Sequence, residues 1–166
     1  MVSWSCCAYV YNQLQESTMK LAYRWITLAN RNYFLYLNRA LAPFGLNSSQ
    51  YQFILNLFDN PGITQDKLPE LICINKSNVA RTLAQLEKKG LIRREVNQDD
   101  KRTATVFLTQ RAHELYPQIM SVIKVWDDAV TKVFSVQDKE ALLALMQRLA
   151  GRAAELRDAT PHALTK

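Results

Sequence analysis

The sequence predicts a mainly α-helical chain that carries one small β-hairpin. Apolar residues recur at a spacing close to 3.6 through most of the 166 residues, and the period shortens to two only over residues 91–108. The composition agrees, because 48% apolar and 22% charged residues are typical of one globular domain with or without terminal arms.

Several classes of protein are excluded by composition. No apolar run approaches the roughly 18 residues that a membrane span needs, and the first residues lack the basic flank of a secretory signal. Three cysteines form no even disulfide framework, so we expect a reducing compartment and a cytoplasmic protein without membrane contact. Two histidines, no Gly-rich phosphate loop and no clustered Cys, His and carboxylate set predict no enzyme, no metal site and no cofactor.

The N-terminal region divides into an arm and a helix. Residues 1–18 contain no Lys or Arg and predict an arm or extension; alternatively, the natural product begins at Met19. A helical pattern then runs over residues 19–42 and ends at the sequence APFG. Its apolar positions are Leu21, Trp25, Leu28, Ala29, Phe34, Leu35 and Leu41.

Two shorter helices are expected next. Asn47 or Ser48 can cap the first, and the sequence DNPG at residues 59–62 ends it. Its apolar positions are Tyr51, Ile54, Leu55 and Phe58. Thr64 can cap the second, over residues 65–72, whose inward side is Leu68, Leu71 and Ile72. Pro69 removes a backbone donor there, so this helix is expected to be short, shifted or kinked.

A third short helix follows the tight connection at residues 73–75 and completes a helix-turn-helix. It spans about residues 76–89, with Val79, Leu83 and Leu86 as the buried stripe and Gly90 as the stop. The opposite side is polar and has no carboxylate: Ser77, Asn78, Arg81, Thr82 and Gln85. A solvated helix face usually mixes Glu with Lys, so the absence of acids is informative.

The sequences LIRREV and TATVFL predict the two strands of a hairpin, joined by the polar loop NQDDKR. Their inward positions are Ile92, Val96, Val106 and Leu108. Residues 75–102 hold eight Lys or Arg against four Asp or Glu, so most of the formal charge of +6 lies here. A polar helix beside a cation-tipped hairpin predicts double-stranded DNA as partner. The helix fits a major groove, and the hairpin tip can reach a minor groove or phosphates.

The remaining residues predict two long helices. Thr109 can cap the first, and Ser135 with Asp138 resembles a capping box that opens the second. Their apolar surface exceeds what a small domain can bury, so we expect a homodimer formed by the first and last helices. The expected organisation is an arm (1–18), an N-terminal dimerisation helix (19–46), a DNA-binding lobe (47–109), C-terminal dimerisation helices (110–158) and a tail (159–166).

The sequence resembles the MarR family of winged helix-turn-helix transcriptional regulators over about residues 20–156. The resemblance is densest in NKSNVARTLAQLEKKGLIRR, similar to the recognition helix of that family, and in DDKRTATVFLT, similar to its wing. It implies that Arg102 enters the minor groove and that Asp100 holds it, with Lys101 beside them. It further implies that Ser77, Asn78, Arg81 and Thr82 read the major groove, flanked by Lys76 and Gln85.

The resemblance also implies a dimer on a pseudo-palindromic operator, with DNA release when a small, commonly aromatic ligand binds between the dimer helices and the DNA-reading lobe. Tyr33, Tyr36, Phe44, Tyr51 and His113 are the candidates for such a pocket, and simple aromatic packing is the alternative. Pro69 departs from the small residue that is usual in the family.

Two other functions remain open from the sequence. One is a helical homodimeric protein-interaction module without DNA binding, which salt-dependent DNA affinity would exclude. The other is a cysteine-based redox-sensing regulator, for which Cys6 and Cys7 are the only candidates. Neither has a nearby cation to lower the pKa of its thiol. Cys73 lies in an apolar turn and is expected to be inert filling.

Overall fold

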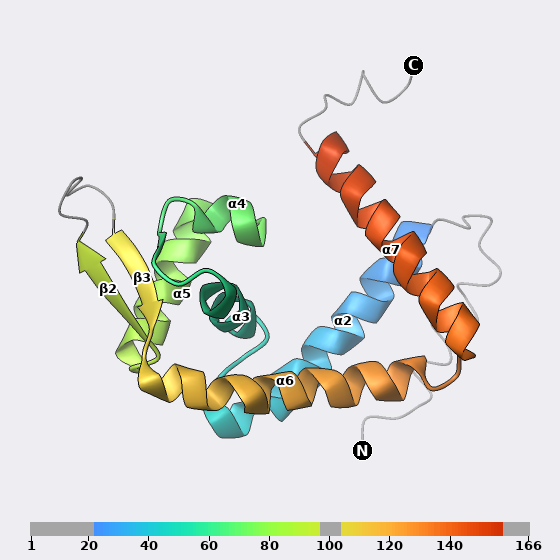
Figure 1. The fold of residues 1–166 in the computed structure, drawn as a ribbon, viewed down its shortest axis with the longest axis horizontal. Coiled ribbons are helices and arrows are strands. Elements are labelled where there is room, and N and C mark those ends of the chain that lie inside the picture. The colour runs from blue at the N-terminus through green and yellow to red at the C-terminus, as the bar shows by residue number, and fades with distance from the viewer. Residues whose placement is uncertain (1–21, 97–103, 158–166) are drawn as a thin grey trace. The chain divides into compact units, whose positions relative to one another are not determined.

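The computed structural model describes residues 22–96 and 104–157, and the expected arm with Cys6, Cys7 and Met19 lies outside them. The elements are α2 (Ala22–Ala40), the 3₁₀ turn η1 (Ala42–Phe44), α3 (Tyr51–Asp59), β1 (Ile63–Thr64), α4 (Leu68–Ile72), α5 (Lys76–Lys88), β2 (Ile92–Val96), β3 (Ala104–Leu108), α6 (Gln110–Thr131) and α7 (Val136–Leu156). Figure 1 shows these elements, which confirm the mainly α-helical class with a small antiparallel sheet. The described residues divide into two compact units, with the boundary between Ile119 and Met120.

Helix α2 ends where the sequence predicts, but its buried positions differ. The APFG sequence forms η1, and Gly45 closes it with φ +70°. Leu41 is buried as predicted, whereas Trp25 and Leu35 are 41% and 51% exposed. Among residues 23–40 only Leu37 is buried, so only the C-terminal end of α2 contributes to the core of its unit.

Helix α3 buries a face that is rotated from the predicted one. Tyr51 and Ile54 are buried as expected, but Phe58 is 38% exposed and Leu55 is half-buried. Phe53 and Leu57 complete the buried face instead, at the i, i+3, i+4 spacing of an amphipathic helix. The Asn47 side chain accepts hydrogen bonds from the N–H groups of Ser49 and Gln50, so it orders the turn before the helix, and Gln50 is the N-cap residue.

Pro69 shortens and shifts α4 as predicted. It is the second residue of the five-residue helix, within the first turn, where a missing N–H has no cost. The prediction that Thr64 caps this helix is wrong, because Thr64 pairs with Thr105 in β1, a strand too short to predict. Leu68 is buried, but Leu71 is 42% exposed, contrary to prediction, because so short a helix presents little inward surface.

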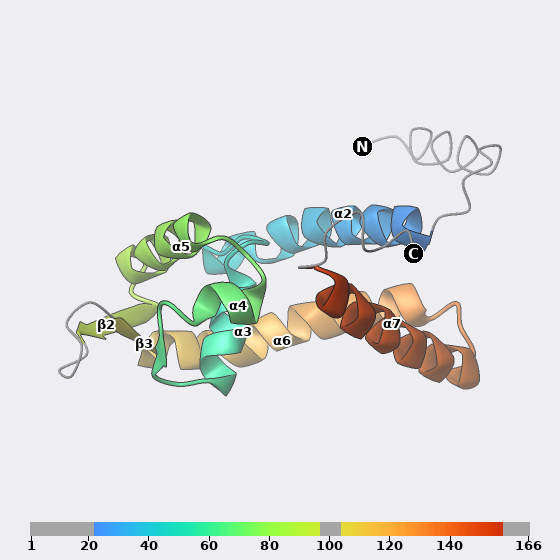
Figure 2. The ribbon, with the colours of Figure 1, turned by 90° about the horizontal axis from the view of Figure 1, so that it is seen from above.

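The turn between α4 and α5 has the predicted three residues. Cys73 ends α4 in the left-handed conformation, with φ +59°. Its side chain is exposed, so the expectation of a buried filling residue is wrong. Helix α4 contacts both α3 and α5, and Figure 2 shows these three helices grouped together.

Asn75 and Gly90 bound the helix α5. The Asn75 side chain caps it by accepting from the Asn78 N–H at 2.8 Å. At the other end Gly90 has φ +68°, its N–H donates to Glu87, and the Leu91 N–H donates to Leu86, which together form a Schellman motif. Val79, Leu83 and Leu86 are buried, which confirms the predicted stripe.

The predicted hairpin is confirmed, and β1 adds a third strand in the order β1-β3-β2. Ile92 pairs with Leu108 and Arg94 with Val106, and all of these except Arg94 are buried. Alternation along β2 places Arg94 on the same face as Ile92, toward α5, which packs against this strand.

The two long helices begin as predicted. Helix α6 starts after Thr109, whose hydroxyl accepts from the Ala112 N–H at 3.4 Å and donates to the Gly90 carbonyl at 2.7 Å. Ser135 caps α7 as predicted, because its hydroxyl accepts from the Asp138 N–H at 3.1 Å, and the same hydroxyl donates to the Asp138 carboxylate at 2.7 Å. None of the helices in the described ranges could cross a membrane.

Candidate nucleic-acid interface

Helix α5 presents an exposed polar face, as predicted, with one exception. Lys76, Ser77, Arg81 and Gln85 are exposed and Asn78 is half-buried. Thr82 is only 7% exposed, so its predicted place on the open face is wrong. The spacing could have indicated this, since Thr82 lies three residues after buried Val79 and four before buried Leu86.

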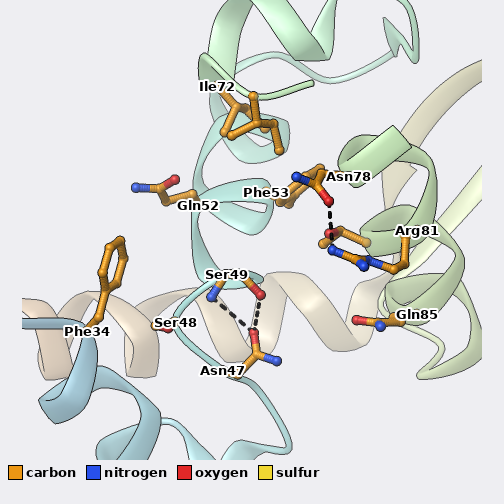
Figure 3. Close-up of a pocket in the computed structure, with 12 residues that line it drawn as sticks. Phe34, Asn47, Ser48, Ser49, Gln52, Phe53, Ile72, Asn78, Arg81 and Gln85 are labelled. Carbon is orange, nitrogen blue, oxygen red and sulfur yellow. Dashed lines mark hydrogen bonds between the residues drawn. The ribbon is translucent and has the colours of Figure 1, made fainter. Parts of the chain in front are cut away.

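The exposed side chains of α5 are ordered by bonds within the helix. The Arg81 Nη2 donates to the Asn78 Oδ1 at 2.7 Å, and Figure 3 shows the two side chains joined. The Ser77 hydroxyl donates to the Asn75 Oδ1 at 2.9 Å. These bonds reduce the side-chain freedom that binding would otherwise have to remove.

The single carboxylate of α5 is neutralised within the protein. Glu87 accepts from the Arg94 Nε at 3.0 Å and also forms an ion pair with its Nη2. This hydrogen bond lowers the pKa of Glu87 below its ordinary value and raises the pKa of Arg94. The Arg94 Nη1 also reaches the Gln65 Oε1 at 3.5 Å, so Arg94 joins β2 to α5 and to the segment before α4.

Not every cation of the basic stretch is available to a partner. Arg94 is paired with Glu87, and Arg93 lies 4.6 Å from the centre of the Phe107 ring in a cation–π contact. The Lys89 ammonium donates to the Gly45 carbonyl at 2.6 Å and to the Gln50 Oε1 at 2.7 Å. The charge count from sequence therefore overstates the free positive surface. On α5 itself the exposed cations are Lys76, Arg81 and Lys88.

A buried amide connects Lys89 to the open face of α5. Gln50 is 1% exposed, and its Nε2 donates to the Gln85 Oε1 at 2.9 Å. No local pattern predicts this connection, because Gln50 lies 35 residues before Gln85 and 39 before Lys89.

A hollow of about 490 Å³ lies between α5 and the start of α3. Asn78, Arg81 and Gln85 line it from α5, and Figure 3 shows Phe34, Asn47, Ser49, Gln52 and Phe53 around it. None of its lining residues has a carboxylate, and Arg81 carries the single charge. No pattern in the sequence predicts this hollow, because its lining residues come from separate segments of the chain.

The five aromatic pocket candidates do not line this hollow. Tyr33 and Tyr51 do meet, edge to face at 6.2 Å between ring centres, whereas His113 lies 5.5 Å from the Phe58 ring. Phe58 in turn stacks on Tyr116 at 3.7 Å. Tyr36 and Phe44 are half-buried. His113 thus packs on Phe58, whereas Tyr33 packs on Tyr51.

The predicted wing residues Asp100, Lys101 and Arg102 lie outside the described residues. Strands β2 and β3, which flank them, are described and are paired along their full length. Within the described ranges no group of three or more His, Cys, Asp or Glu residues is placed to hold a metal ion.

Comparisons with known proteins agree with this geometry. The model of the MarR family matches residues 46–104. The HTH-type transcriptional regulator YwoH of Bacillus subtilis (strain 168), itself uncharacterised, is 31% identical over 110 residues, which cover 66% of this chain and 80% of that protein. A crystal structure of MarR superposes with a TM-score of 0.79 at 27% identity, over 85% of this chain and 96% of that one. A MarR family regulator from Listeria monocytogenes, crystallised with a 26mer DNA, gives 0.76 at 25% identity, over 82% and 91%.

A helix-turn-helix followed by an antiparallel hairpin defines a winged helix-turn-helix protein. The chain belongs to the MarR family of transcriptional regulators. Members of this family are transcriptional regulators and not enzymes.

Proposed function

We propose that the protein is a sequence-specific transcriptional repressor that binds double-stranded DNA as a homodimer and is released by a small aromatic ligand. The observation that carries the proposal is the open face of α5, where Lys76, Asn78, Arg81 and Gln85 are accessible and the one carboxylate of the helix is paired with Arg94. Such a face suits the acceptor-rich floor and phosphate walls of a major groove.

Dimerisation supplies the second reading helix. The described part of the second unit leaves Val125, Val133, Val136, Leu145 and Leu149 between 42% and 81% exposed. Exposed apolar side chains in such number indicate a protein interface. In a two-fold dimer the two copies of α5 enter successive major grooves, about 34 to 36 Å apart, on a pseudo-palindromic operator. Occupation of promoter DNA by such a dimer represses transcription.

The loop between β2 and β3 reaches the adjacent minor groove in this proposal. Arg102 enters the groove and Asp100 holds it, as the resemblance to the family implies, and we assign Lys101 to the phosphates beside them. Support comes from the Listeria relative that was crystallised with DNA and from the ion pair that fixes β2 to α5. Ser77 and Gln85 complete the contacts of α5, whereas burial leaves Thr82 a supporting place behind them.

The ligand proposal has two candidate places in the first unit. One is the edge-to-face pair Tyr33 and Tyr51. The other is the hollow beside α5, where Phe34 and Phe53 offer aromatic surface and Arg81 offers a cation for an acidic group. Occupation of the hollow would cover Arg81, a residue proposed to read DNA, and so would compete with the operator. Phe34→Ala abolishes release by benzoate if the hollow is the site, and Tyr33→Ala abolishes it if the tyrosine pair is the site.

The test of DNA binding is a salt titration on the DNA upstream of the protein's own gene. Binding weakens steeply as salt rises, because each neutralised phosphate releases counterions. Arg81→Ala should weaken the binding free energy on the operator by about 1 to 3 kcal/mol, and the variant should no longer discriminate between bases at one base pair. Arg93→Ala is the matched control, since Arg93 lies in the same basic stretch but its guanidinium rests over the Phe107 ring. An absence of DNA affinity at low salt would favour the protein-interaction module instead.

A further inference from the structure

We propose that Lys89 and Gln50 fix the amide of Gln85 so that it offers only hydrogen-bond donors to DNA, which makes α5 select guanine over adenine where Gln85 meets a base. The inference rests on the proposed function, in which α5 reads the major groove. It adds two residues that touch no base, Lys89 and Gln50, as positioning residues for base choice.

The first step is the orientation of Gln50. A lysine ammonium has three donors and no acceptor, so the group that faces it must be an acceptor. The Lys89 Nζ lies 2.7 Å from the Gln50 Oε1 and 2.6 Å from the Gly45 carbonyl oxygen. Because Gln50 is 1% exposed, no water can readily take over the role of Lys89. The oxygen end of this amide is therefore held toward Lys89.

The second step passes this orientation to Gln85. With its oxygen toward Lys89, Gln50 can only turn its nitrogen toward α5, and its Nε2 donates to the Gln85 Oε1 at 2.9 Å. Gln85 in turn must place its oxygen toward Gln50, which leaves its NH₂ group as the end that faces outward. A Gln with no such neighbour is free to present either end.

Arg81 orients the Asn78 amide in the same way, with its oxygen held within the protein. Its Oδ1 accepts from the Arg81 Nη2 at 2.7 Å, so its remaining group is also an NH₂. Arg81 itself has donors only. Three neighbouring side chains on the open face thus present donors, and Figure 3 shows them on the same side of α5.

A donor-only amide changes the expected base. Gln recognises adenine by donating to N7 and accepting from the N6 amino group with its oxygen, but guanine shows two acceptors, N7 and O6. Since the Gln85 oxygen is held by Gln50, adenine would leave its amino group unmatched, whereas guanine matches the NH₂ group. We expect a preference for guanine on the order of tenfold at this position.

The experiment is selection from a random duplex pool, followed by sequencing, with the full-length protein and four variants. Gln85→Ala identifies the base pair that Gln85 reads, because its preference disappears there. Replacement of each guanine in the selected site by 7-deazaguanine, and of each adenine by 7-deazaadenine, identifies the contacted base. The wild type should lose affinity with 7-deazaguanine at that base pair, and Gln85→Ala should not.

Gln50→Glu gives the sharpest variant. The carboxylate keeps the contact with Lys89 but cannot donate, so Gln85 must turn its NH₂ inward and its oxygen outward. The preferred base should change from guanine to adenine or cytosine, which show amino groups in the major groove. Gln52→Glu is the matched control, with the same charge change two residues further along in the first turn of α3, and should weaken binding without changing the base.

Lys89→Met provides an independent variant that leaves the side-chain stem in place. It frees both amides, so adenine and guanine should be selected about equally at the same base pair. The inference would be overturned if Gln85 of the wild type contacts adenine, or if Gln50→Glu and Lys89→Met both keep the wild-type base preference. Neither result would contradict the proposal that the protein binds DNA. A wild type that enriches no sequence would overturn the proposed function as well.

Discussion

The two compact units of the chain bury their apolar side chains to very different degrees. In the first, Phe53, Leu68, Leu83 and Val106 are all 1% exposed or less, and a buried polar chain through Gln50 ties α3 to α5. In the second, α7 has no buried residue over its whole length, Val136–Leu156. The first unit therefore has its own core behind α5 and the hairpin, whereas the described part of the second unit leaves apolar side chains exposed. The contrast is the one expected if the first unit reads DNA and the second pairs with another copy of the chain, as we propose.

The largest effect should come from the same substitution made in both units. Leu57→Ala removes a 1% exposed side chain of α3 and should cost about 2 to 5 kcal/mol of unfolding free energy. Leu145→Ala, at a position 59% exposed on α7, should cost less than about 0.5 kcal/mol when the protein is dilute. Urea unfolding followed by circular dichroism measures both.

Protein concentration separates the two variants further. The deficit of Leu145→Ala should grow at high concentration, because a partner then covers the side chain in the parent protein, while that of Leu57→Ala should stay constant. Equal, concentration-independent losses would contradict the division between the two units.

A charge placed on α7 should break the proposed dimer. Leu149 is 42% exposed in the single chain, and Leu149→Asp would bury a carboxylate against the partner. We expect the dissociation constant of the dimer to rise roughly a hundredfold, which corresponds to about 3 kcal/mol. Operator affinity should fall in parallel. Sedimentation equilibrium measures the first and fluorescence anisotropy the second. Gln147→Asp, at an exposed polar position of the same helix, should change neither.

Local signals in the sequence predicted the elements well, because they depend on neighbours along the chain. Asn75, Gly90 and the pair Ser135 and Asp138 set helix ends through hydrogen bonds that span at most five residues, and all lie where expected. Pro69 also acts locally, by fixing the first turn of α4. Strand β1 was missed because two residues show no alternation; only pairing with β3 defines it.

The sequence predicts less well which side chains are buried and how the side chains of the site are connected, because both depend on residues that are distant along the chain. Periodicity indicates which residues share a face but not which neighbour covers it, so Phe53 and Leu57 were missed and Leu71 was misplaced. The face of α5 was predicted except for Thr82. Lys89 was counted only as a cation, since the Gln50 that fixes its role comes from another helix.

The smallest predicted effect concerns the ion pair that joins the hairpin to α5. The hydrogen bond from Arg94 lowers the pKa of Glu87 below its ordinary value of 4.5. A lowered folded-state pKa means that the stabilisation is present above pH 4.5 and is lost as the pH falls through the folded-state pKa. Because both side chains are about one third exposed, at 38% and 33%, solvent screening limits the contribution to about 0 to 1 kcal/mol.

Urea unfolding of the wild type and Glu87→Gln between pH 7 and pH 3 tests this sign. The wild type should be slightly more stable at pH 7, and the gap should close below pH 4.5 as Glu87 takes up its proton. Arg94→Ala should show the same closing gap, since it removes the other half of the pair, and the double variant should add little to either. A gap that persists unchanged to pH 3 would mean that Glu87 acts through packing. The hairpin would then be held against α5 by β2 contacts alone. The contrast between the two units would in that case depend on apolar burial and on the hydrogen bonds of the Gln50 amide.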